Sequence, residues 1–418
     1  MISSRDHRWR RLALATAVSL LALPSLAASL SLEDALNLAE RQAPSLAAQS
    51  ARLAAASHLA VSAGELPDPK LLLGVQNFPI GGPERGSLDD DFMTMQMVGV
   101  MQEVPNRAKR RARVEVAQAA VDRAEAERQV EALKVRRDTA LAWIATYSVE
   151  RKLQLFSTLY QENRLLHDAV RAQLGAGLGQ AADSIAPRQE AAQLAEQEDQ
   201  LMQSREVARA ALRRWIGEAG NAPLAGGLPD WPIAAARYPH NLRRHPELAA
   251  YTPMQQEAAA GVRQALADKR PDWSWELDYQ RRGREFGDML SVQFSIDLPI
   301  FPGSRQDPKI AAQYAQVARL EAEREALERE YAQAQHSDLG EYARLSRAVR
   351  RSEELLLPLA EEKVTLSLAG YRAGNGALAD VLVARRELID ARLRQIDLQG
   401  QRAQVGTALY FTYGESAQ

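Results

Sequence analysis

Three methionines at alternate positions, Met93, Met95 and Met97, are the residues whose type and spacing first suggest chemistry. Thioether sulfurs bind soft metal ions, so the series could form a ladder of weak metal ligands. The alternative is lipid contact, because an internal repeat described below aligns the three methionines with the apolar face of a later strand. We expect lipid contact and no metal site.

Other catalytic or metal-binding patterns are absent from the sequence. Cysteine is missing altogether, which excludes thiolate catalysis and zinc–thiolate sites. There is no nucleophile elbow, phosphate loop or zincin motif. Histidines outside the N-terminal segment lack any H-x-x-x-H or glutamate-paired spacing, and they are His58, His167, His240, His245 and His336. We therefore expect neither an enzyme nor a bound cofactor.

Two glycine-rich segments predict tight turns between helices. They are LGAGLGQAAD at 174–183 and YRAGNGALAD at 371–380. Glycine adopts positive φ at little cost, which such turns require. The glycines concerned are Gly177, Gly179, Gly374 and Gly376.

Each turn ends in an aspartate, Asp183 in the first and Asp380 in the second. If copies of Asp380 faced a narrow pore, their carboxylates would repel one another and attract cations. The simpler alternative is that Asp380 caps the helix that follows, by accepting hydrogen bonds from its free N–H groups. The sequence leaves both roles open.

The two turns belong to an internal repeat of 197 residues (374 − 177 = 197). A tandem duplication is indicated because many identities share this offset without a gap. The pairs are Gln96/Gln293, Pro105/Pro302, Gly177/Gly374, Gly179/Gly376, Asp183/Asp380, Arg188/Arg385, Glu190/Glu387 and Gly217/Gly414. We assign residues 29–219 and 236–418 to the two repeats and 220–235 to a linker.

The N-terminus has the features of a secretory signal peptide. A basic region with Arg5, Arg8 and Arg10 precedes the apolar run Leu12–Leu23, and small residues follow it. We therefore expect residues 1–28 to be removed during export. No later apolar run is long enough for a transmembrane helix. The net charge of −2 gives no reason to expect nucleic-acid binding.

Within each repeat the pattern predicts a β-hairpin, a long helix, a turn and a second helix. Residues 107–173 contain neither proline nor glycine and keep a helical spacing of apolar residues. Such a helix would be about 100 Å long at 1.5 Å per residue, too long for a globular core. The second long helix is expected over about 308–370, where Pro358 should kink it or mark a join.

The hairpins, at about 70–104 and 272–298, alternate apolar and polar residues as transmembrane β-strands do. Lumen-facing positions are predicted at Glu276, Asp278, Gln293 and Asp297. Lipid-facing positions are predicted at Trp273, Trp275, Leu277, Tyr279, Met93, Met95, Met97 and Phe294. Four strands cannot close a barrel, which needs about eight, and open edges cannot face lipid. We therefore expect several copies of the chain to close the barrel together as a ring.

The duplicated plan, with YRAGNGALADVLVARREL at Tyr371–Leu388, resembles the TolC-like outer-membrane efflux family over nearly the whole exported chain. Within it, the segments LPDPKLLLGVQNFPIGGPE, DFMTMQMVGVMQEVPN and RPDWSWELDYQRRG are most similar to the cobalt–zinc–cadmium resistance branch. The resemblance implies a homotrimer with a twelve-stranded barrel in the outer membrane, continued by a long α-helical barrel in the periplasm.

It also implies partners: a periplasmic adaptor and an inner-membrane resistance–nodulation–division pump, both at the end of the tunnel formed by the turns. Gating positions of the family fall on Asp380, Asp183, Tyr371 and Arg372. Two positions depart from the family pattern. Gly376 replaces a gate arginine that can occur there, and Val383 replaces a second ring aspartate. Without cysteine, the lipid anchor of many relatives is also missing.

The expected function is a passive exit duct for heavy-metal cations in a tripartite efflux system. The same duct could instead carry drugs or other organic compounds, or serve type I secretion. A different class of protein, a soluble periplasmic coiled-coil adaptor, would have the long helices but no membrane barrel.

Overall fold

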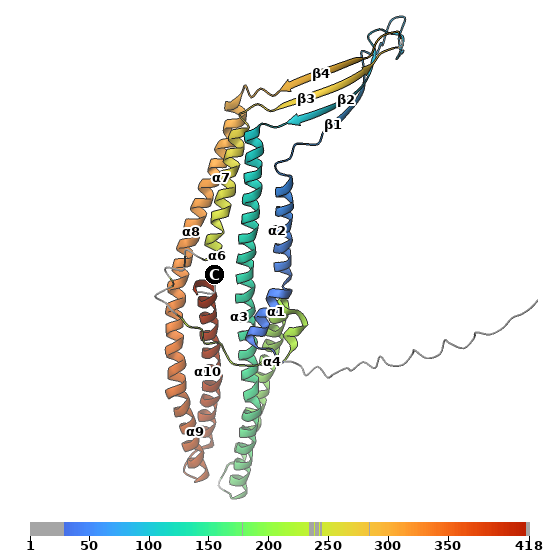
Figure 1. Cartoon of the computed structure of the whole chain (residues 1–418). Helices are drawn as coiled ribbons and strands as arrows, with labels where there is room; N and C mark the ends of the chain where they lie inside the picture. Colours follow the sequence, from blue (N-terminus) through green and yellow to red (C-terminus); the bar gives the residue numbers. More distant parts are fainter. Residues whose placement is uncertain are drawn as a thin grey trace, which may run out of the picture.

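A computed structural model describes residues 29–177, 179–233, 238, 242, 245–283 and 285–414. The predicted signal peptide, His240 and the last two residues of the predicted linker lie outside the described residues. The rest is a long, mainly helical body with a sheet projecting from one end (Figure 1). The predicted fold class, a tandem repeat with long helices and a few antiparallel strands, is confirmed.

Long helices run lengthwise through the body. In the first repeat, α3 (Arg107–Gly175) is followed by the short 3-10 helix η1 (Ala181–Ser184) and by α4 (Ala186–Ile216). The second repeat has α8 (Pro302–Arg351), α9 (Leu357–Arg372) and α10 (Leu378–Tyr413). Both α3/α4 and α9/α10 turn back at the same end of the molecule, opposite the sheet (Figure 1).

Shorter helices complete the middle of the body and the part nearest the sheet. They are α1 (Leu32–Gln42), α2 (Pro44–Ser62), η2 (Gly217–Asn221), α6 (Pro246–Ala249) and α7 (Tyr251–Ala267). Ser31 caps α1 in a capping box with Asp34, as its sequence position favours. No helix in the described ranges is both long and apolar enough to cross a membrane.

The second long helix is interrupted where Pro358 disturbs it. A π-helical turn, η4 (Ser352–Leu356), separates α8 from α9, and Pro358 is the second residue of α9. Proline has no N–H to donate and its ring crowds the preceding turn, so the local hydrogen-bond pattern widens. The predicted join is therefore a π-turn. Pro308, where we expected the helix to begin, lies inside α8 instead.

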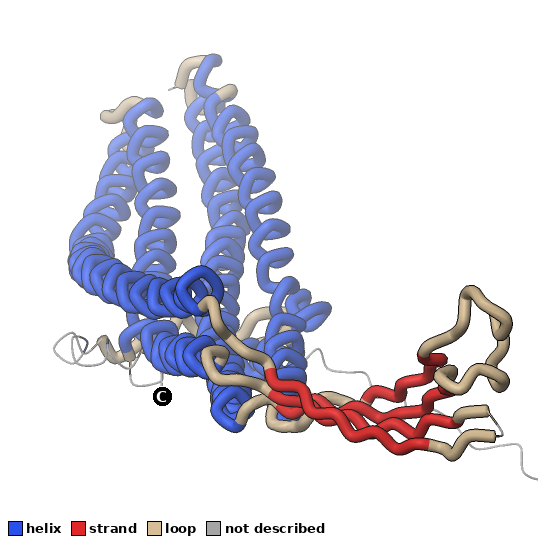
Figure 2. The backbone as a smooth tube through the Cα atoms, turned by 90° about the horizontal axis from the view of Figure 1, so that it is seen from above, coloured by secondary structure: helices blue, strands red, loops and turns tan. Residues whose placement is uncertain are grey.

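The sheet has four antiparallel strands in the order β1-β2-β3-β4. These are β1 (Lys70–Gln76), β2 (Met95–Val104), β3 (Trp273–Arg281) and β4 (Met289–Ile296). The two hairpins join through β2 and β3, so each repeat contributes half of one continuous ribbon (Figure 2). At its base, the Asn106 backbone N–H donates to Asp272 Oδ1 at 2.7 Å, which ties the start of α3 to β3.

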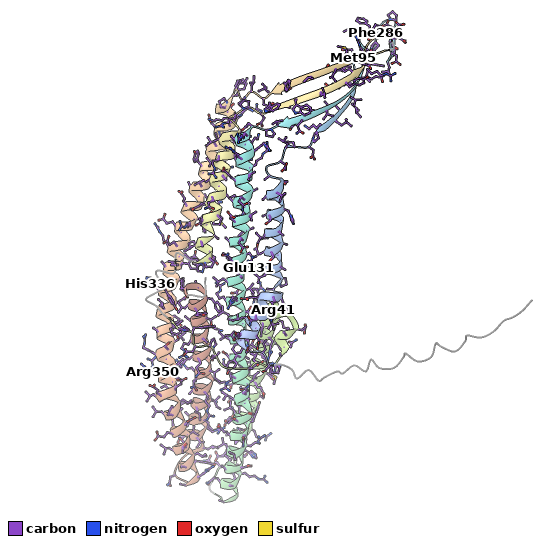
Figure 3. The ribbon with its side chains drawn as sticks, in the orientation of Figure 1. Arg41, Met95, Glu131, Phe286, His336 and Arg350 are labelled. Carbon is purple, nitrogen blue, oxygen red and sulfur yellow. The ribbon has the colours of Figure 1, made fainter. Side chains whose placement is uncertain are left out.

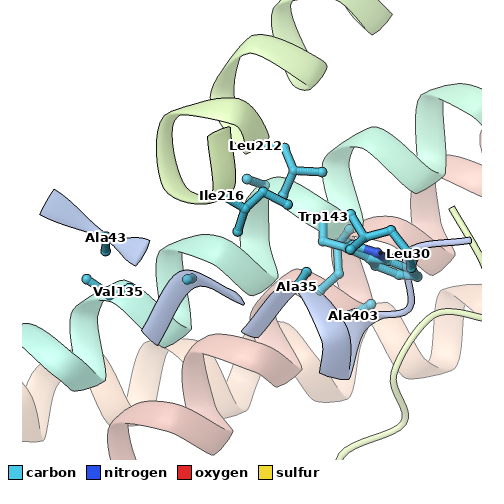
Figure 4. Packing of buried hydrophobic residues seen from close by; sticks show 11 residues of the cluster. Leu30, Ala35, Ala43, Val135, Trp143, Leu212, Ile216 and Ala403 are labelled. Carbon is cyan, nitrogen blue, oxygen red and sulfur yellow. Dashed lines mark hydrogen bonds between the residues drawn. The ribbon is translucent and has the colours of Figure 1, made fainter. Parts of the chain in front are cut away.

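The central core joins the start of the described chain to both repeats. Trp143 of α3 is fully buried, and its Nε1 donates to the carbonyl oxygen of Leu30 at 3.2 Å (Figure 4). Leu30 also forms a parallel bridge with Leu224 in the segment between the repeats. Ala403 of α10 packs against the same cluster, so the linker, the N-terminal segment and the second repeat share one core.

Candidate functional site: a two-faced sheet and two helix turns

One face of the sheet carries polar side chains from both hairpins. Residues that pair across an antiparallel sheet lie on the same face, so the register assigns the faces. Asp278 pairs with Gly99 and Ser291, and Glu276 pairs with Met101 and Gln293. The predicted lumen residues Glu276, Asp278 and Gln293 thus share a face. Asp297 lies one residue beyond the end of β4.

The opposite face is apolar and largely exposed. It includes Leu71, Leu73, Val98, Val100, Trp273, Trp275, Leu277, Tyr279, Leu290, Val292 and Phe294. Phe294 and Leu290 are each 68% exposed, far more than a water-soluble sheet of this size would leave uncovered. The predicted lipid-facing residues of β3 and β4 therefore do lie together.

The prediction for Met95 and Met97 was wrong about the face of the sheet. Met97 pairs with Gln280, and Met95 is two residues away on the same strand, so both lie on the polar face. Met93 precedes β2 and belongs to no strand (Met95 is labelled in Figure 3). The error came from the 197-residue offset, which aligns Met97 with Phe294. In the structure these two residues lie on opposite faces of the sheet, because Met97 pairs with Gln280 and Phe294 pairs with Trp275. A slip of one residue reverses the face of every side chain.

The two helix turns are in contact at the far end of the body. Gln173 Nε2 donates to the carbonyl oxygen of Arg372 at 3.1 Å, which links the end of α3 to the end of α9. Gly177 and Gly374 both have φ of +74°, the left-handed conformation expected of the two turns. Gly376 approaches its own chain, since a Cβ there would lie 3.1 Å from the backbone of Gly370 and Tyr371.

Asp183 and Asp380 differ in their surroundings. Asp183 Oδ2 accepts a hydrogen bond from the backbone N–H of Gln180 at 2.9 Å, so this carboxylate caps η1. Asp380 lies in the first turn of α10, whose N-cap is Ala377, and it makes no side-chain capping bond. Its side chain is exposed. Hydrogen-bonded capping, one of its two candidate roles, is thus absent in this chain.

Tyr371 belongs to the core rather than to the surface of the turn. Its ring is 6% exposed and packs with Leu166 and Val170 of α3 and with Leu378 and Val381 of α10. Its buried hydroxyl lacks a hydrogen-bond partner within the described part of the chain. Burial raises the pKa of this hydroxyl, and the negative charge of Asp183 raises it further. Arg372, by contrast, is exposed.

A buried ion pair just above the turns joins the two repeats. Arg385 of α10 donates through Nη2 to Glu190 Oε1 of α4 at 2.8 Å and through Nε at 3.1 Å. On α3, Glu162 Oε2 lies 3.9 Å from Arg385 Nη1, and Glu162 Oε1 lies 2.9 Å from Arg392 Nη1. We did not predict this network. The sequence did contain a signal for it in the repeat pairs Arg188/Arg385 and Glu190/Glu387. A charge that recurs at the same position of both repeats suggests that this position makes a similar contact in each.

Metal ligands do not gather anywhere in the described ranges. No group of three or more histidine or acidic side chains is placed to hold an ion. His336 lies partway along α8 (Figure 3).

Comparison with known proteins agrees with this geometry. Residues 238–415, which make up nearly all of the second repeat, match the outer membrane efflux protein family. The match covers less than half of the chain. No curated protein matches the sequence closely enough to count as a relative.

Solved structures extend the likeness to almost the whole chain. The outer membrane protein VceC of Vibrio cholerae is 18% identical, with a TM-score of 0.76 over 92% of this chain and 96% of its own. A membrane protein of Pseudomonas aeruginosa reaches 0.79 at 17% identity, covering 92% of both chains. The open-state MtrE outer membrane channel of Neisseria gonorrhoeae reaches 0.75 at 18% identity, covering 93% of this chain and 89% of its own.

The chain as a whole therefore has the outer membrane efflux protein fold, in which both repeats take part. The outer membrane efflux protein family, which the second repeat matches, agrees with our prediction that the protein is not an enzyme. The fold that the resemblance implies is confirmed, and the family match itself covers the second repeat. These comparisons do not distinguish the cobalt–zinc–cadmium resistance branch from other branches.

Proposed function

We propose that this protein is the outer-membrane exit duct of a tripartite efflux system. One observation carries the proposal: the sheet has an exposed apolar face and a polar face, and it grows directly out of a long helical body. An apolar face turned to lipid and a polar face turned to water are what a membrane β-barrel requires. The duct itself would use no energy.

The duct would be a ring of three copies. β1 and β4 are the edges of the sheet, and each leaves a row of backbone N–H and C=O groups without strand partners. Such edges cannot face lipid, so β4 of one copy must pair with β1 of the next. Three copies give twelve strands, and their helices continue the barrel toward the periplasm.

Heavy-metal cations are the cargo that we propose. The polar face presents Glu276 and Asp278, and the corrected register adds the thioethers of Met95 and Met97 to it. Carboxylates attract cations, and thioethers favour soft ones. Drugs and other organic compounds are the second candidate cargo, because a duct need not select what a pump has already selected.

The turns at 174–183 and 371–380 would form the periplasmic end, where an adaptor and an inner-membrane resistance–nodulation–division pump would dock. This end carries Asp380, which is exposed and accepts no capping hydrogen bond. We propose that copies of this carboxylate line the aperture and favour cations there. The signal peptide at residues 1–28 would direct export, and the absence of cysteine leaves no lipid anchor.

Membrane fractionation tests the duct against the soluble-adaptor alternative. We expect the protein in the outer-membrane fraction and a heat-modifiable oligomer when unboiled and boiled samples are compared on a gel. Recovery in the soluble periplasm without such an oligomer would favour the adaptor. Cargo is tested in a deletion strain grown with zinc, cadmium or cobalt salts and with common drugs. Sensitivity to drugs alone would overturn the metal assignment.

A further inference from the structure

The boundary between the two repeats shows how one repeat receives its neighbour. The groove between α3 and α4 holds α10, whose Ile389 packs against Leu159 and Leu194. Beside this contact, Arg385 forms its buried ion pair with Glu190. The first repeat thus buries its groove against one face of the second.

The second repeat has an equivalent groove that no described segment of the chain fills. Adding 197 to Leu159 and Glu190 gives Leu356 and Glu387. Both line a groove of about 450 Å³ that runs between α10 and the stretch formed by the end of α8, η4 and α9. Leu159 is 1% exposed, whereas Leu356 is 51% exposed. The groove is therefore a copy of the buried one with its occupant missing.

We infer that α4 of the adjacent copy fills this groove and that Arg188 of that copy pairs with Glu387. The inference rests on the proposed ring, in which repeats alternate around one axis. In such a ring, the second repeat of one copy would meet the first repeat of the next copy in the way that the two repeats meet within one chain. The equivalent of the contact between Arg385 and Glu190 is then a contact between Arg188 of the next copy and Glu387. Arg188 is exposed in the chain and makes no ion pair within the described residues.

The facing surfaces are complementary at other positions as well. Arg386 donates to Gln193 at 3.2 Å within the chain, and the equivalent pair between copies is Gln189 with Asp390. The side-chain amide of Gln189 can donate a hydrogen bond to the carboxylate of Asp390, just as the guanidinium of Arg386 donates to Gln193. Two turns farther along α4 from Gln189, exposed Glu196 comes to the level where Arg394 lines the groove. These pairs make a second copy of the chain the occupant that the groove fits.

Within a single chain, Lys363 is the ion-pair partner of Glu387, the role that we assign to Arg188 of the adjacent copy. Its ammonium contacts Glu387 at 2.6 Å, and both side chains are about half exposed. Arginine forms paired hydrogen bonds with a carboxylate that lysine cannot, so Arg188 can compete for this carboxylate. The residue equivalent to Lys363 in the first repeat is the buried Leu166. The boundary between copies is therefore more polar than the boundary within the chain.

Cross-linking tests the contact directly, because the chain contains no cysteine of its own. Two differently tagged versions, one Arg188→Cys and one Glu387→Cys, are expressed together and treated with a short bis-maleimide. We expect a covalent dimer that carries both tags, and no dimer when either version is expressed alone. A single chain with Glu190→Cys and Arg385→Cys is the matched control, in which the same reagent should form an internal bridge without a dimer.

The outcomes separate this inference from the proposed function. If the unmodified protein is a trimer and the control bridges, the absence of a two-tag dimer overturns the inference alone. If the protein is not a trimer, both fail. Charge reversal gives an independent check: Arg188→Glu or Glu387→Arg should each lower the temperature at which the trimer band is lost, and the double reversal should restore it. Equal loss in single and double variants would contradict the pair.

Discussion

The carboxylate of Asp278 lies directly over Gly99 on the neighbouring strand, where a Cβ would overlap its Oδ1 atom. Asp278 is only 5% exposed, and its Oδ1 lacks a hydrogen-bond partner in the described part of the chain. The missing side chain at residue 99 is thus what admits an acidic group to the polar face of the sheet.

Gly99→Ala should weaken the sheet, because the new methyl group must displace Asp278 and also meets the Leu277 carbonyl oxygen. Overpacking of this kind costs about 1–3 kcal/mol. We expect less heat-resistant oligomer on unboiled gels and partial recovery on adding Asp278→Ala. Gly287→Ala is the control, since a Cβ at that position meets nothing within 4 Å. Equal losses in both alanine variants would argue against the contact.

Adjacent residues of β2 should differ in their access to water. Met97→Cys places a thiol on the polar face, and Val98→Cys places one on the apolar face. In intact outer membranes we expect a charged, water-soluble thiol reagent to label residue 97 and not residue 98. Mass spectrometry of the labelled protein measures both. Preferential labelling at residue 98 would restore the earlier assignment of the methionines to the lipid face.

Glu190→Ala should destabilise the helical body strongly, because it leaves the Arg385 guanidinium buried without its main partner. Removing one member of a buried pair costs about 3–5 kcal/mol. Thermal unfolding of the detergent-solubilised protein measures the loss. Glu325→Ala removes the exposed pair with Arg329 on α8, which should cost about 1 kcal/mol or less. The prediction fails if the two variants unfold at the same temperature.

The stability of the body should fall as the pH drops below about 6.5, the ordinary pKa of histidine. Burial lowers the pKa of His245, and nearby Arg137 lowers it further, although Glu247 opposes this. The unfolded chain therefore binds more protons than the folded one in this range, so stability decreases on acidification. Tyr331, packed against the ring, is neutral throughout.

His245→Asn isolates this effect. His245 Nδ1 accepts a hydrogen bond from the Glu247 backbone N–H at 3.2 Å, and asparagine can cap α6 in the same way without titrating. Unfolding temperatures measured between about pH 5 and 8 should therefore vary less in the variant than in the native protein. An unchanged dependence on pH would assign it to other groups.

Asp380→Asn should reduce the attraction of the aperture for cations without harming the fold, because the carboxylate makes no capping bond. In planar bilayers we expect weaker block by added divalent cations. Asp183→Asn serves for comparison, since it alters the carboxylate that caps η1. Unchanged conductance and unchanged block in the Asp380 variant would remove this residue from the aperture.

The sequence alone determined the order of elements, because proline, glycine and apolar spacing act locally. The helix expected over 107–173 spans Arg107–Gly175, and both glycine turns have the same positive φ. The duplication was equally plain, since Gly177, Asp183 and Arg188 recur at one offset.

Only the tertiary structure decided what depends on pairing between distant segments. The face on which Met97 lies follows from its pairing with Gln280, which a count of residues cannot supply because strand register can slip by one. The burial of Arg385 against Glu190 likewise requires two repeats to pack side by side. Local patterns specify helices and turns, whereas contacts between repeats depend on how those elements are brought together in space.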